Sequence, residues 1–455
     1  MSSPAPRRMP SERHALIGHA GPDAIAAWRR GEPVSAGRFL SDVSRAADAM
    51  PASRHVLNFC ADRYRFAVAL FAAIVRGQTT LLPPTTTPNV IESMRAFAPD
   101  AYYVADEAQP HVSLPRCELP EGVTGSDDRA FAVPQIDAEQ VIACLFTSGS
   151  TGEPQPYRKH WGSLARNILG EAQRLGVRPG HVILGTVPPQ HMYGFESTVL
   201  LPLLSGAALT AERPYYPADI DAAIQGVPSP RVLFTTPFHL RAWVESGEAA
   251  SLETIVSATA PLSVGLARAA EQRTGAQLLE IYGCTESGQV ATRRPTESVE
   301  WLPFDGLRIW TEGAQAMAVG AHVDVPTPLQ DVIEVTPDGT RFLLHGRSAD
   351  MVNVAGKRNS LGYLNHQLTS IPGVADGVFF LPDEQPDAVT RLVALVVAPG
   401  LTSADVLEEL RHRIDAAFLP RPVLMVESLP RSLTGKLPRD ALLALAESAR
   451  ARGRG

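Results

Sequence analysis

Lysine is scarce in this sequence of 455 residues: three of the 41 basic residues are lysines, and the other 38 are arginines. Because arginine supplies the general surface charge, each remaining lysine marks a candidate position for a compact cation. Lys159, Lys357 and Lys436 all lie in or next to segments that contain glycine. Chance placement of the three lysines is the alternative interpretation.

Cysteine, long apolar runs and excess positive charge are scarce as well. The four cysteines are far apart and lack Cys-x-x-Cys spacing, which indicates neither a zinc site nor a disulfide framework and fits a reducing cytoplasm. The longest apolar run, Phe66 to Val75, is too short to span a bilayer. The net charge of −7 argues against nucleic acid as a partner. We therefore expect a cytoplasmic globular protein with no membrane span and, from its length, two domains.

The most informative stretch runs from Val141 to His160, VIACLFTSGSTGEPQPYRKH. It begins with an apolar run of the length expected for a buried strand. Thr147 to Gly152 then place four hydroxyl groups and two glycines in six residues, which suits a backbone that wraps around a polyphosphate. A Walker A loop would need a lysine after the second glycine, where Glu153 stands. A flexible linker is the alternative interpretation.

The segment TSGSTGEP resembles the phosphate loop of the adenylate-forming enzymes, which include acyl- and aryl-CoA synthetases, luciferases and nonribosomal peptide adenylation domains. Further segments similar to motifs of this family follow in order: YGCTE at 282–286, LQDVIEV around Asp331, HGRSADMVNVAGKRNS at 345–360 and LPRSLTGKLPRD at 429–440. The resemblance covers about Arg38 to Leu443 and thins between Glu286 and Asp331. It implies that the protein uses ATP and Mg²⁺ to activate a small carboxylic acid.

Strand patterns that alternate with helical patterns predict an α/β protein with parallel or mixed sheets flanked by helices. After Gly346 a smaller α+β pattern follows. With the resemblance, this divides the chain into an N-terminal adenylation core, residues 1–346, and a small, mobile C-terminal catalytic domain, residues 347–455. The expected elements are strand, helix and strand within Val56–Pro84, helices at Gly37–Met50, Trp161–Leu175, Leu361–Leu368 and Ser403–Phe418 and after Pro438, strands at Val374–Leu381, Arg391–Ala398 and Val423–Glu427, and a turn-rich connector at Thr85–Asn89.

The resemblance also implies roles for residues around the nucleotide. Glu286 would ligate Mg²⁺ and Thr285 would contact the adenylate; oxygen ligands of this kind suit Mg²⁺. Asp331 would bind the ribose hydroxyls. A surface turn with a solvated glutamate is the alternative for the YGCTE segment. The residues expected to bind the nucleotide are Thr147, Ser148, Gly149, Ser150, Thr151, Gly152, Tyr282, Gly283, Asp331, Arg347 and Arg358.

Lys436 matches the lysine of the family's C-terminal catalytic loop, which contacts the substrate carboxylate and the α-phosphate. Attack of one anion on another is opposed by repulsion, so a cation between them stabilises the transition state. Gly356 matches the glycine that lets a pantetheine arm pass when a thiol attacks in the second half-reaction. A solvated lysine in a glycine turn is the alternative for Lys436.

Three sites depart from the family pattern: the lysine that normally ends the phosphate loop is Gln155, the Thr-Gly before the ribose aspartate is Leu329–Gln330, and the Asp or Lys hinge is Ala349, followed by Asp350. Arg158 or Lys159 are candidates to supply the missing loop charge. The departures keep a non-catalytic nucleotide-binding scaffold open as an alternative, against which the intact Glu286 and Lys436 argue.

The short N-terminal domain and the PQPYRKHW and KRNSL segments look most like the aryl ligases of bacterial aryl-polyene, xanthomonadin-type pigment pathways. This implies activation of a hydroxybenzoate and its transfer to the phosphopantetheine thiol of an acyl carrier protein. A CoA synthetase for a fatty acid or another aryl acid is the alternative. By position, the walls of the acid pocket would be His191, Tyr193, Phe238 and Ile281, and two of them could hydrogen-bond a phenol.

Overall fold

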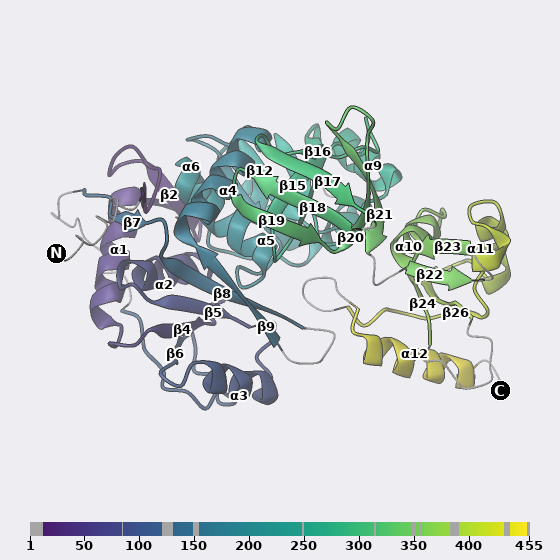
Figure 1. Ribbon diagram of the computed structural model, residues 1–455, viewed down its shortest axis with the longest axis horizontal. Coiled ribbons are helices and arrows are strands. Elements are labelled where there is room, and N and C mark those ends of the chain that lie inside the picture. Colours follow the sequence, from purple (N-terminus) through teal and green to yellow (C-terminus); the bar gives the residue numbers. More distant parts are fainter. Residues whose placement is uncertain are drawn as a thin grey trace, which may run out of the picture.

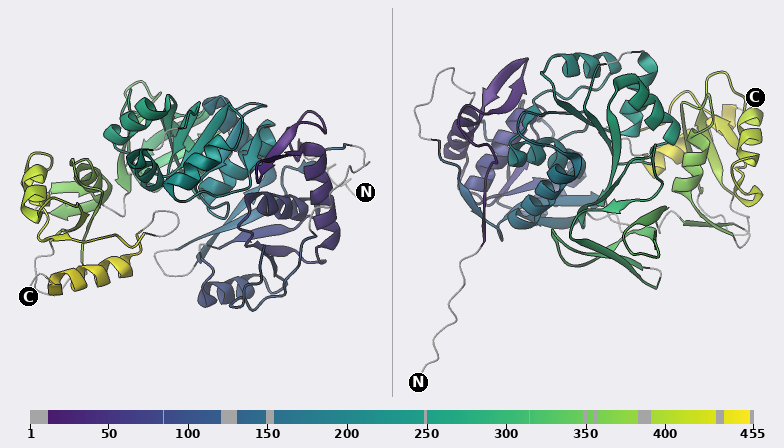
Figure 2. Two further views of the ribbon diagram at one scale, coloured as in Figure 1. Left: turned by 180° about the vertical axis from the view of Figure 1, so that it is seen from behind. Right: turned by 90° about the horizontal axis from the view of Figure 1, so that it is seen from above.

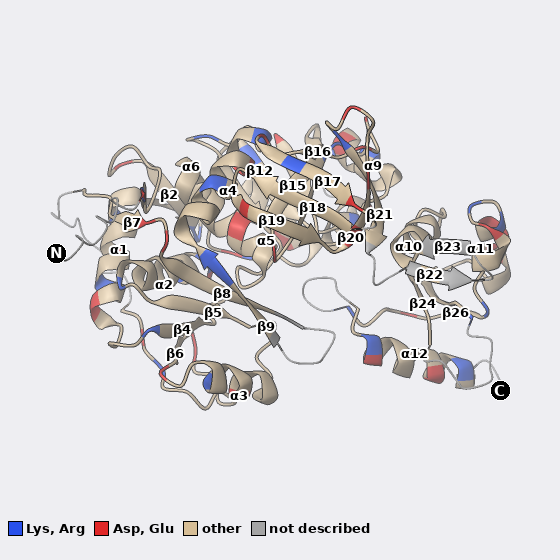
Figure 3. Cartoon of the chain, viewed as in Figure 1, with Lys and Arg blue, Asp and Glu red and all other residues tan. Residues whose placement is uncertain are grey.

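The computed structural model describes residues 12–83, 85–120, 131–148, 154–247, 250–313, 315–347, 351–354, 357–382, 391–431 and 437–452. The described residues form a large body of sheets and helices and a smaller C-terminal group beside it (Figure 1). Helix α1 (Ala36–Ala49), near the start of the described chain, and the last helix, α12 (Arg439–Arg452), lie at opposite ends of the molecule, as the views in Figure 2 also show. Acidic and basic segments are interspersed over both parts (Figure 3).

The largest sheet joins nine of the described strands in the order β16-β15-β14-β13-β12-β10-β11-β2-β3. Its central strands are parallel, and antiparallel pairs form at both edges. Strands such as β10 and β13 are buried along their whole length, which is typical of parallel strands covered on both faces. The strands are β2 (Ile25–Arg29), β3 (Glu32–Ser35), β10 (Val182–Gly185), β11 (Ala208–Thr210), β12 (Arg231–Thr235), β13 (Thr254–Ser257), β14 (Gln277–Cys284), β15 (Gly288–Arg293) and β16 (Leu302–Pro303).

A second sheet joins five described strands in the order β6-β4-β5-β8-β9. Four of them are parallel, and β9 closes the edge as the antiparallel partner of β8. The strands are β4 (His55–Asn58), β5 (Thr79–Leu82), β6 (Tyr102–Val104), β8 (Val141–Ser148) and β9 (Pro154–His160). A separate, short antiparallel pair joins β1 (Arg13–Ala15) with β7 (Gln135–Asp137).

Helices cover the two sheets, and one of them is buried almost all round. This helix, α2, begins after Asp62, whose side chain accepts a hydrogen bond from the backbone N–H of Arg65, and its largely apolar sequence fits a helix enclosed by core. A continuous helical segment consists of α5 (Met192–Gly194), the π-helical turn η1 (Phe195–Leu200) and α6 (Leu201–Ser205). The other helices of the large body are α1 (Ala36–Ala49), α2 (Arg63–Val75), α3 (Pro88–Phe97), α4 (Trp161–Leu175), α7 (Pro217–Gln225), α8 (Pro237–Ser246) and α9 (Val264–Thr274).

A smaller layer of antiparallel strands packs on the end of the largest sheet. Its core contains Tyr282, at the end of β14, together with Trp301 and Phe342. The Tyr282 ring meets each of these two rings at centroid distances of 5.8 Å. This contact fixes the end of β14 against the layer. The strands of the layer are β17 (Leu307–Glu312), β18 (Gln315–Gly320), β19 (Val323–Leu329), β20 (Asp331–Val335) and β21 (Phe342–Arg347).

The C-terminal group builds its hydrophobic cores from its own residues. One core contains Leu364, Phe379 and Val406, and a second places Phe380 against Leu442 of the last helix. Arg241 of the large body donates a hydrogen bond across to the Val374 carbonyl at 3.5 Å. The elements are β22 (Met351–Val354), β23 (Lys357–Ser360), α10 (Leu361–Thr369), β24 (Asp376–Phe380), β25 (Val393–Val397), α11 (Ser403–Arg411), a 3₁₀ turn (Ala416–Phe418), β26 (Val423–Met425) and α12 (Arg439–Arg452).

The expected α/β architecture, with mixed sheets, flanking helices and a small C-terminal domain, is confirmed. Two element predictions are wrong in part. The connector at Thr85–Asn89 already contains the start of α3, because Pro88 occupies the first helical turn, where no backbone N–H is needed. The helix expected at Ser403–Phe418 ends at Arg411, and the Asp415 side chain then begins a separate 3₁₀ turn.

All four cysteines lie in described segments and are free thiols. None of the helices in the described part of the chain combines the length and apolar character that crossing a bilayer requires.

Candidate active site

The phosphate-loop segment joins the two strands of the β8–β9 hairpin. Buried residues of β8, Ala143 to Phe146, anchor this hairpin in the sheet, and Thr147 and Ser148 extend the strand by two residues beyond the apolar run. In the backbone register Thr147 lies opposite Gln155. The predicted phosphate contacts Gly149, Ser150, Thr151 and Gly152 fall outside the described residues.

The YGCTE segment forms the end of β14 and the tight turn into β15. A Cβ atom at Gly283 would lie 2.4 Å from the Gly288 carbonyl oxygen, so the close approach of the two strands requires glycine there. Thr285 and Glu286 are half-buried at the tip of this turn. Burial raises the pKa of the Cys284 thiol to about 11, so it stays protonated at neutral pH and is no nucleophile. The turn thus presents the hydroxyl and carboxylate oxygens that the sequence singled out.

Predicted nucleotide residues from separate motifs meet beside this turn. The Tyr282 hydroxyl donates a hydrogen bond to Asp331 Oδ2 at 2.8 Å. On the neighbouring strand, Arg347 lies opposite Asp331 in the β20–β21 register. Asp331 and Arg347 follow Tyr282 by 49 and 65 residues in the sequence. The antiparallel layer brings both of them to the end of β14. Arg358 lies on β23, in the C-terminal group.

Lys159 of β9 reaches the same turn from the other side. Its side chain is buried, and its Nζ donates a hydrogen bond to the Thr285 carbonyl oxygen. Burial lowers the pKa of Lys159, and the carboxylates of Glu196 and Glu286 oppose that shift. A buried cation thus connects the phosphate hairpin directly to the turn that carries Glu286.

Two buried carboxylates lie beneath this turn. Glu196, on η1, accepts a hydrogen bond from Asn167 Nδ2 at 2.8 Å, and burial raises its pKa to about 7 even though Lys159 opposes the shift. Glu171, on α4, is fully buried; burial, with a contribution from Glu196, raises its pKa to about 8. A π-helical turn is a rare element often found at functional sites, and here it supplies the counter-charge for Lys159.

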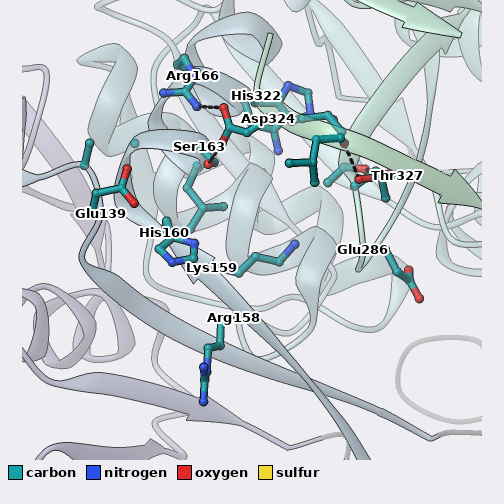
Figure 4. A pocket seen from close by; sticks show the side chains of 18 of the residues that line it. Glu139, Arg158, Lys159, His160, Ser163, Arg166, Glu286, His322, Asp324 and Thr327 are labelled. Atoms are coloured by element: carbon teal, nitrogen blue, oxygen red, sulfur yellow. Dashed lines mark hydrogen bonds and ion pairs between the residues drawn. The ribbon is translucent and has the colours of Figure 1, made fainter. Parts of the chain in front are cut away.

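A polar cavity of about 660 Å³ opens between β9, α4 and β19, with Lys159 and Glu286 in its wall (Figure 4). At its rim Arg166 forms an ion pair with Asp324 at 2.5 Å, and the Ser163 hydroxyl donates to the same carboxylate. In Figure 4 the Arg158 side chain points away from Lys159. The cavity therefore gives access to the turn that carries Glu286.

The described residues suit a Mg²⁺ ion that is held mainly by substrate oxygens. They contain no group of three or more His, Cys, Asp or Glu side chains arranged to hold a metal by themselves. Glu286 instead offers one carboxylate at the tip of a turn that Lys159 of the β8–β9 hairpin contacts at Thr285. Mg²⁺ that carries ATP is commonly bound by one or two carboxylates plus phosphate oxygens, so this donor set fits.

The predicted walls of the acid pocket separate into two groups. Tyr193 and Ile281 belong to the same buried cluster, and His191 directly precedes α5 as its N-cap residue. The Tyr193 hydroxyl already donates to the Val256 carbonyl at 2.9 Å, so toward a substrate phenol it can only accept a hydrogen bond. Phe238 lies in the first turn of α8, is 40% exposed and packs its ring against His239.

The remaining predicted site residues, Lys436, Gly356 and the hinge position Ala349, lie outside the described residues. Sequence reasoning missed Glu171, Glu196 and Asn167, which support the turn from below. The only available signal was an acidic residue within an otherwise apolar helical segment, such as Glu196 in GFESTVLL. Scarcity of lysine did mark Lys159.

The AMP-binding enzyme family matches residues 18–314 of this sequence. The chain belongs to that family. Among its relatives, a 4-coumarate–CoA ligase of Rhodobacter capsulatus is 30% identical over 309 residues, 66% of this chain and 75% of the relative. A 3-hydroxybenzoate–CoA ligase of Aromatoleum sp. strain CIB is 23% identical over 376 residues, 73% of this chain and 71% of the relative.

Solved structures agree with this assignment at the level of the fold. ATP-bound MatB from Rhodopseudomonas palustris superimposes with a TM-score of 0.79 over 94% of this chain and 96% of that chain, at 19% identity. As an AMP-binding enzyme, the protein is an ATP-dependent, AMP-forming acid–thiol ligase.

Proposed function

We propose that this AMP-binding enzyme converts an aromatic carboxylic acid and ATP into an aryl adenylate and pyrophosphate, and then transfers the aryl group to the thiol of CoA. In the first step a carboxylate oxygen bonds to the α-phosphorus and pyrophosphate leaves. In the second step the thiol sulfur bonds to the acyl carbon and AMP leaves with the carboxylate oxygen.

The observation that carries the proposal is the convergence at the end of β14. Tyr282 holds Asp331 at 2.8 Å, Arg347 lies opposite Asp331, and Lys159 connects the turn with Glu286 to the phosphate hairpin. The segments that the family resemblance assigns to the ribose and to the metal thus meet, and the β8–β9 hairpin, which carries the phosphate segment, contacts them through Lys159. A scaffold without catalysis would not need a half-buried carboxylate at this point.

In this proposal each group acts on the charge that develops during adenylation. Glu286 would hold the Mg²⁺ that bridges the ATP phosphates, and Asp331 would accept hydrogen bonds from the ribose hydroxyls. The hydroxyl-rich segment 147–152 would donate to the phosphates. Lys436 would stand between the two reacting anions, where a cation stabilises the transition state more than the ground state.

We further propose that the chain divides at residues 346/347 and that the C-terminal domain, 347–455, rotates between the two steps. The separate cores of the C-terminal group support this division. Rotation would remove Lys436 from the adenylate and bring Gly356 to the path of the thiol. The exact pivot within 348–350 stays a prediction.

The choice of acid and acceptor rests on the relatives and on the pocket. The 4-coumarate and 3-hydroxybenzoate CoA ligases favour an aromatic acid and CoA, and the buried cluster around Tyr193 and Ile281 offers an apolar wall for a ring. These two relatives favour CoA as the acceptor over the acyl carrier protein that the sequence resemblance implied. A hydroxybenzoate is compatible with this proposal, because His191, the N-cap residue of α5 two positions before Tyr193, carries a polar side chain.

An acid-dependent exchange of labelled pyrophosphate into ATP tests the proposal. The panel should contain 4-hydroxybenzoate, 3-hydroxybenzoate, 4-coumarate, benzoate and medium-chain fatty acids. We expect exchange with one or more aromatic acids and little with the fatty acids. Thioester formation with CoA, compared with a phosphopantetheinylated carrier protein, then decides the acceptor. Exchange with none of the acids would refute the proposed activity.

A further inference from the structure

Lys159 occupies a position from which it cannot simply replace the lysine missing at the phosphate loop. It lies four residues after Gln155 on β9, a span of about 13 Å along a strand. Its side chain is buried, and its Nζ donates to the Thr285 carbonyl oxygen. The cation is thus engaged by the peptide unit immediately before Glu286.

The turn is also held at its other end, at Gly288. Gly288 has a positive φ of 74°, and a Cβ atom there would lie 2.7 Å from Asn167 Nδ2 and 3.4 Å from Glu196 Oε1. The backbone therefore rests directly on the hydrogen-bonded pair of Asn167 and Glu196. With Lys159 bound to the Thr285 carbonyl and this pair packed against Gly288, the turn has little freedom to move.

Resting on the proposed function, we propose that Lys159 is a positioning residue that fixes the Thr285–Glu286 peptide unit, so that the Glu286 carboxylate meets the Mg²⁺ of the bound Mg·ATP in one orientation. Lys159 touches neither metal nor nucleotide in this role. Residues that orient a metal ligand typically change metal affinity by about 10- to 100-fold when removed.

A purely structural role makes a different prediction. Lys159 also faces the buried carboxylate of Glu196, and removing one member of a buried charge pair strongly destabilises a fold. If Lys159 served only as this counter-charge, removing both charges together would restore normal behaviour. If it holds the carbonyl of Thr285, the defect would persist without any charge imbalance.

The test compares Lys159→Met, the double variant Lys159→Met/Glu196→Gln and the control Arg166→Gln. Arg166 is a cation of the same cavity, at the rim and paired with Asp324. Two quantities are measured: the Mg²⁺ concentration for half-maximal pyrophosphate exchange, and, by calorimetry, the affinity for ATP with Mg²⁺ and with EDTA. Thermal unfolding reports whether each variant is folded.

We expect the double variant to unfold near the wild-type temperature. It should nevertheless need at least about 10-fold more Mg²⁺ for half-maximal pyrophosphate exchange. In calorimetry, Mg²⁺ should no longer increase its affinity for ATP. The affinity of the double variant for metal-free ATP should match that of the wild type. The control Arg166→Gln should match the wild type in both the Mg²⁺ dependence and the ATP affinity. Wild-type Mg²⁺ dependence in the double variant, or the same defect in Arg166→Gln, would overturn the proposal.

Lys159→Arg provides a second test if the double variant does not fold. It keeps a positive charge beside Glu196 but replaces the single ammonium with a longer, planar donor. We expect this variant to fold and still to need at least about threefold more Mg²⁺ than the wild type for half-maximal pyrophosphate exchange. Wild-type Mg²⁺ dependence would show that charge alone is sufficient and would overturn the positioning role. A wild-type protein without acid-dependent exchange would instead refute the proposed function, while the calorimetry would still test Lys159.

Discussion

Replacing Glu171 with glutamine should stabilise the protein at high pH. The Glu171 carboxyl is fully buried on α4, and burial raises its pKa to about 8, whereas a glutamate in an unfolded chain titrates near 4.3. Between these two values the folded protein keeps a proton that the unfolded chain has released. The contribution of Glu171 to the free energy of unfolding therefore falls as pH rises from about 4.5 to 8, and is constant above that range.

The size of the effect follows from the shift. Moving the pKa from 4.5 to about 8 corresponds to about 5 kcal/mol at about 1.4 kcal/mol per unit. Water that enters around an ionised carboxylate reduces this penalty, so we expect Glu171→Gln to gain about 2–4 kcal/mol at pH 9 and almost nothing at pH 5. Ser197 and Gln289 lie beside the carboxyl group and can also receive an amide.

Guanidinium unfolding at several values between pH 5 and 9, followed by tryptophan fluorescence, measures this difference. All five tryptophans precede residue 347, so the signal reports the large body that contains Glu171. Glu92→Gln is the matched control, because Glu92 lies on α3 with its side chain 68% exposed and should change stability by less than about 0.5 kcal/mol at any pH. Equal pH dependence in Glu171→Gln and the wild type would refute the reasoning.

Three further substitutions test separate parts of the account. Lys436→Ala should lower pyrophosphate exchange by about 10²- to 10³-fold while calorimetry shows unchanged ATP binding; an unchanged exchange rate would remove this lysine from the mechanism. Glu286→Ala should lower exchange at every Mg²⁺ concentration, and full rescue by excess Mg²⁺ would show a weak, replaceable ligand. Arg63 donates to the carbonyls of Gly185, Val187, Thr210 and Glu212 at 2.7–3.2 Å, so Arg63→Met should cost at least about 3 kcal/mol in guanidinium unfolding, and a loss below 1 kcal/mol would contradict this.

Local sequence patterns predicted those parts of the fold whose structure is decided locally. The helix expected at Trp161–Leu175 is α4 with the same bounds, and the strand, helix and strand of Val56–Pro84 are β4, α2 and β5. The antiparallel layer of β17–β21 was not predicted. Its strands carry exposed apolar residues such as Val325, so their pattern does not alternate cleanly.

The candidate site shows the same division. The resemblance to the adenylate-forming enzymes placed Tyr282 and Asp331 in one nucleotide site, and the structure joins them by a hydrogen bond. The support beneath the turn was beyond sequence reasoning, because Glu196 meets Asn167 and Glu171 of α4 only when this helix packs on η1. Burial, and with it a raised pKa, is a property of that packing rather than of the local sequence.

Oxygen transfer from the acid to AMP tests the central claim most directly. The protein is incubated with ATP, Mg²⁺, CoA and an aromatic acid whose two carboxylate oxygens are ¹⁸O. Mass spectrometry then measures the masses of the AMP and of the thioester. Adenylation predicts AMP that carries one ¹⁸O and a thioester that keeps the other. Unlabelled AMP, or ¹⁸O found in inorganic phosphate together with ADP, would contradict the account.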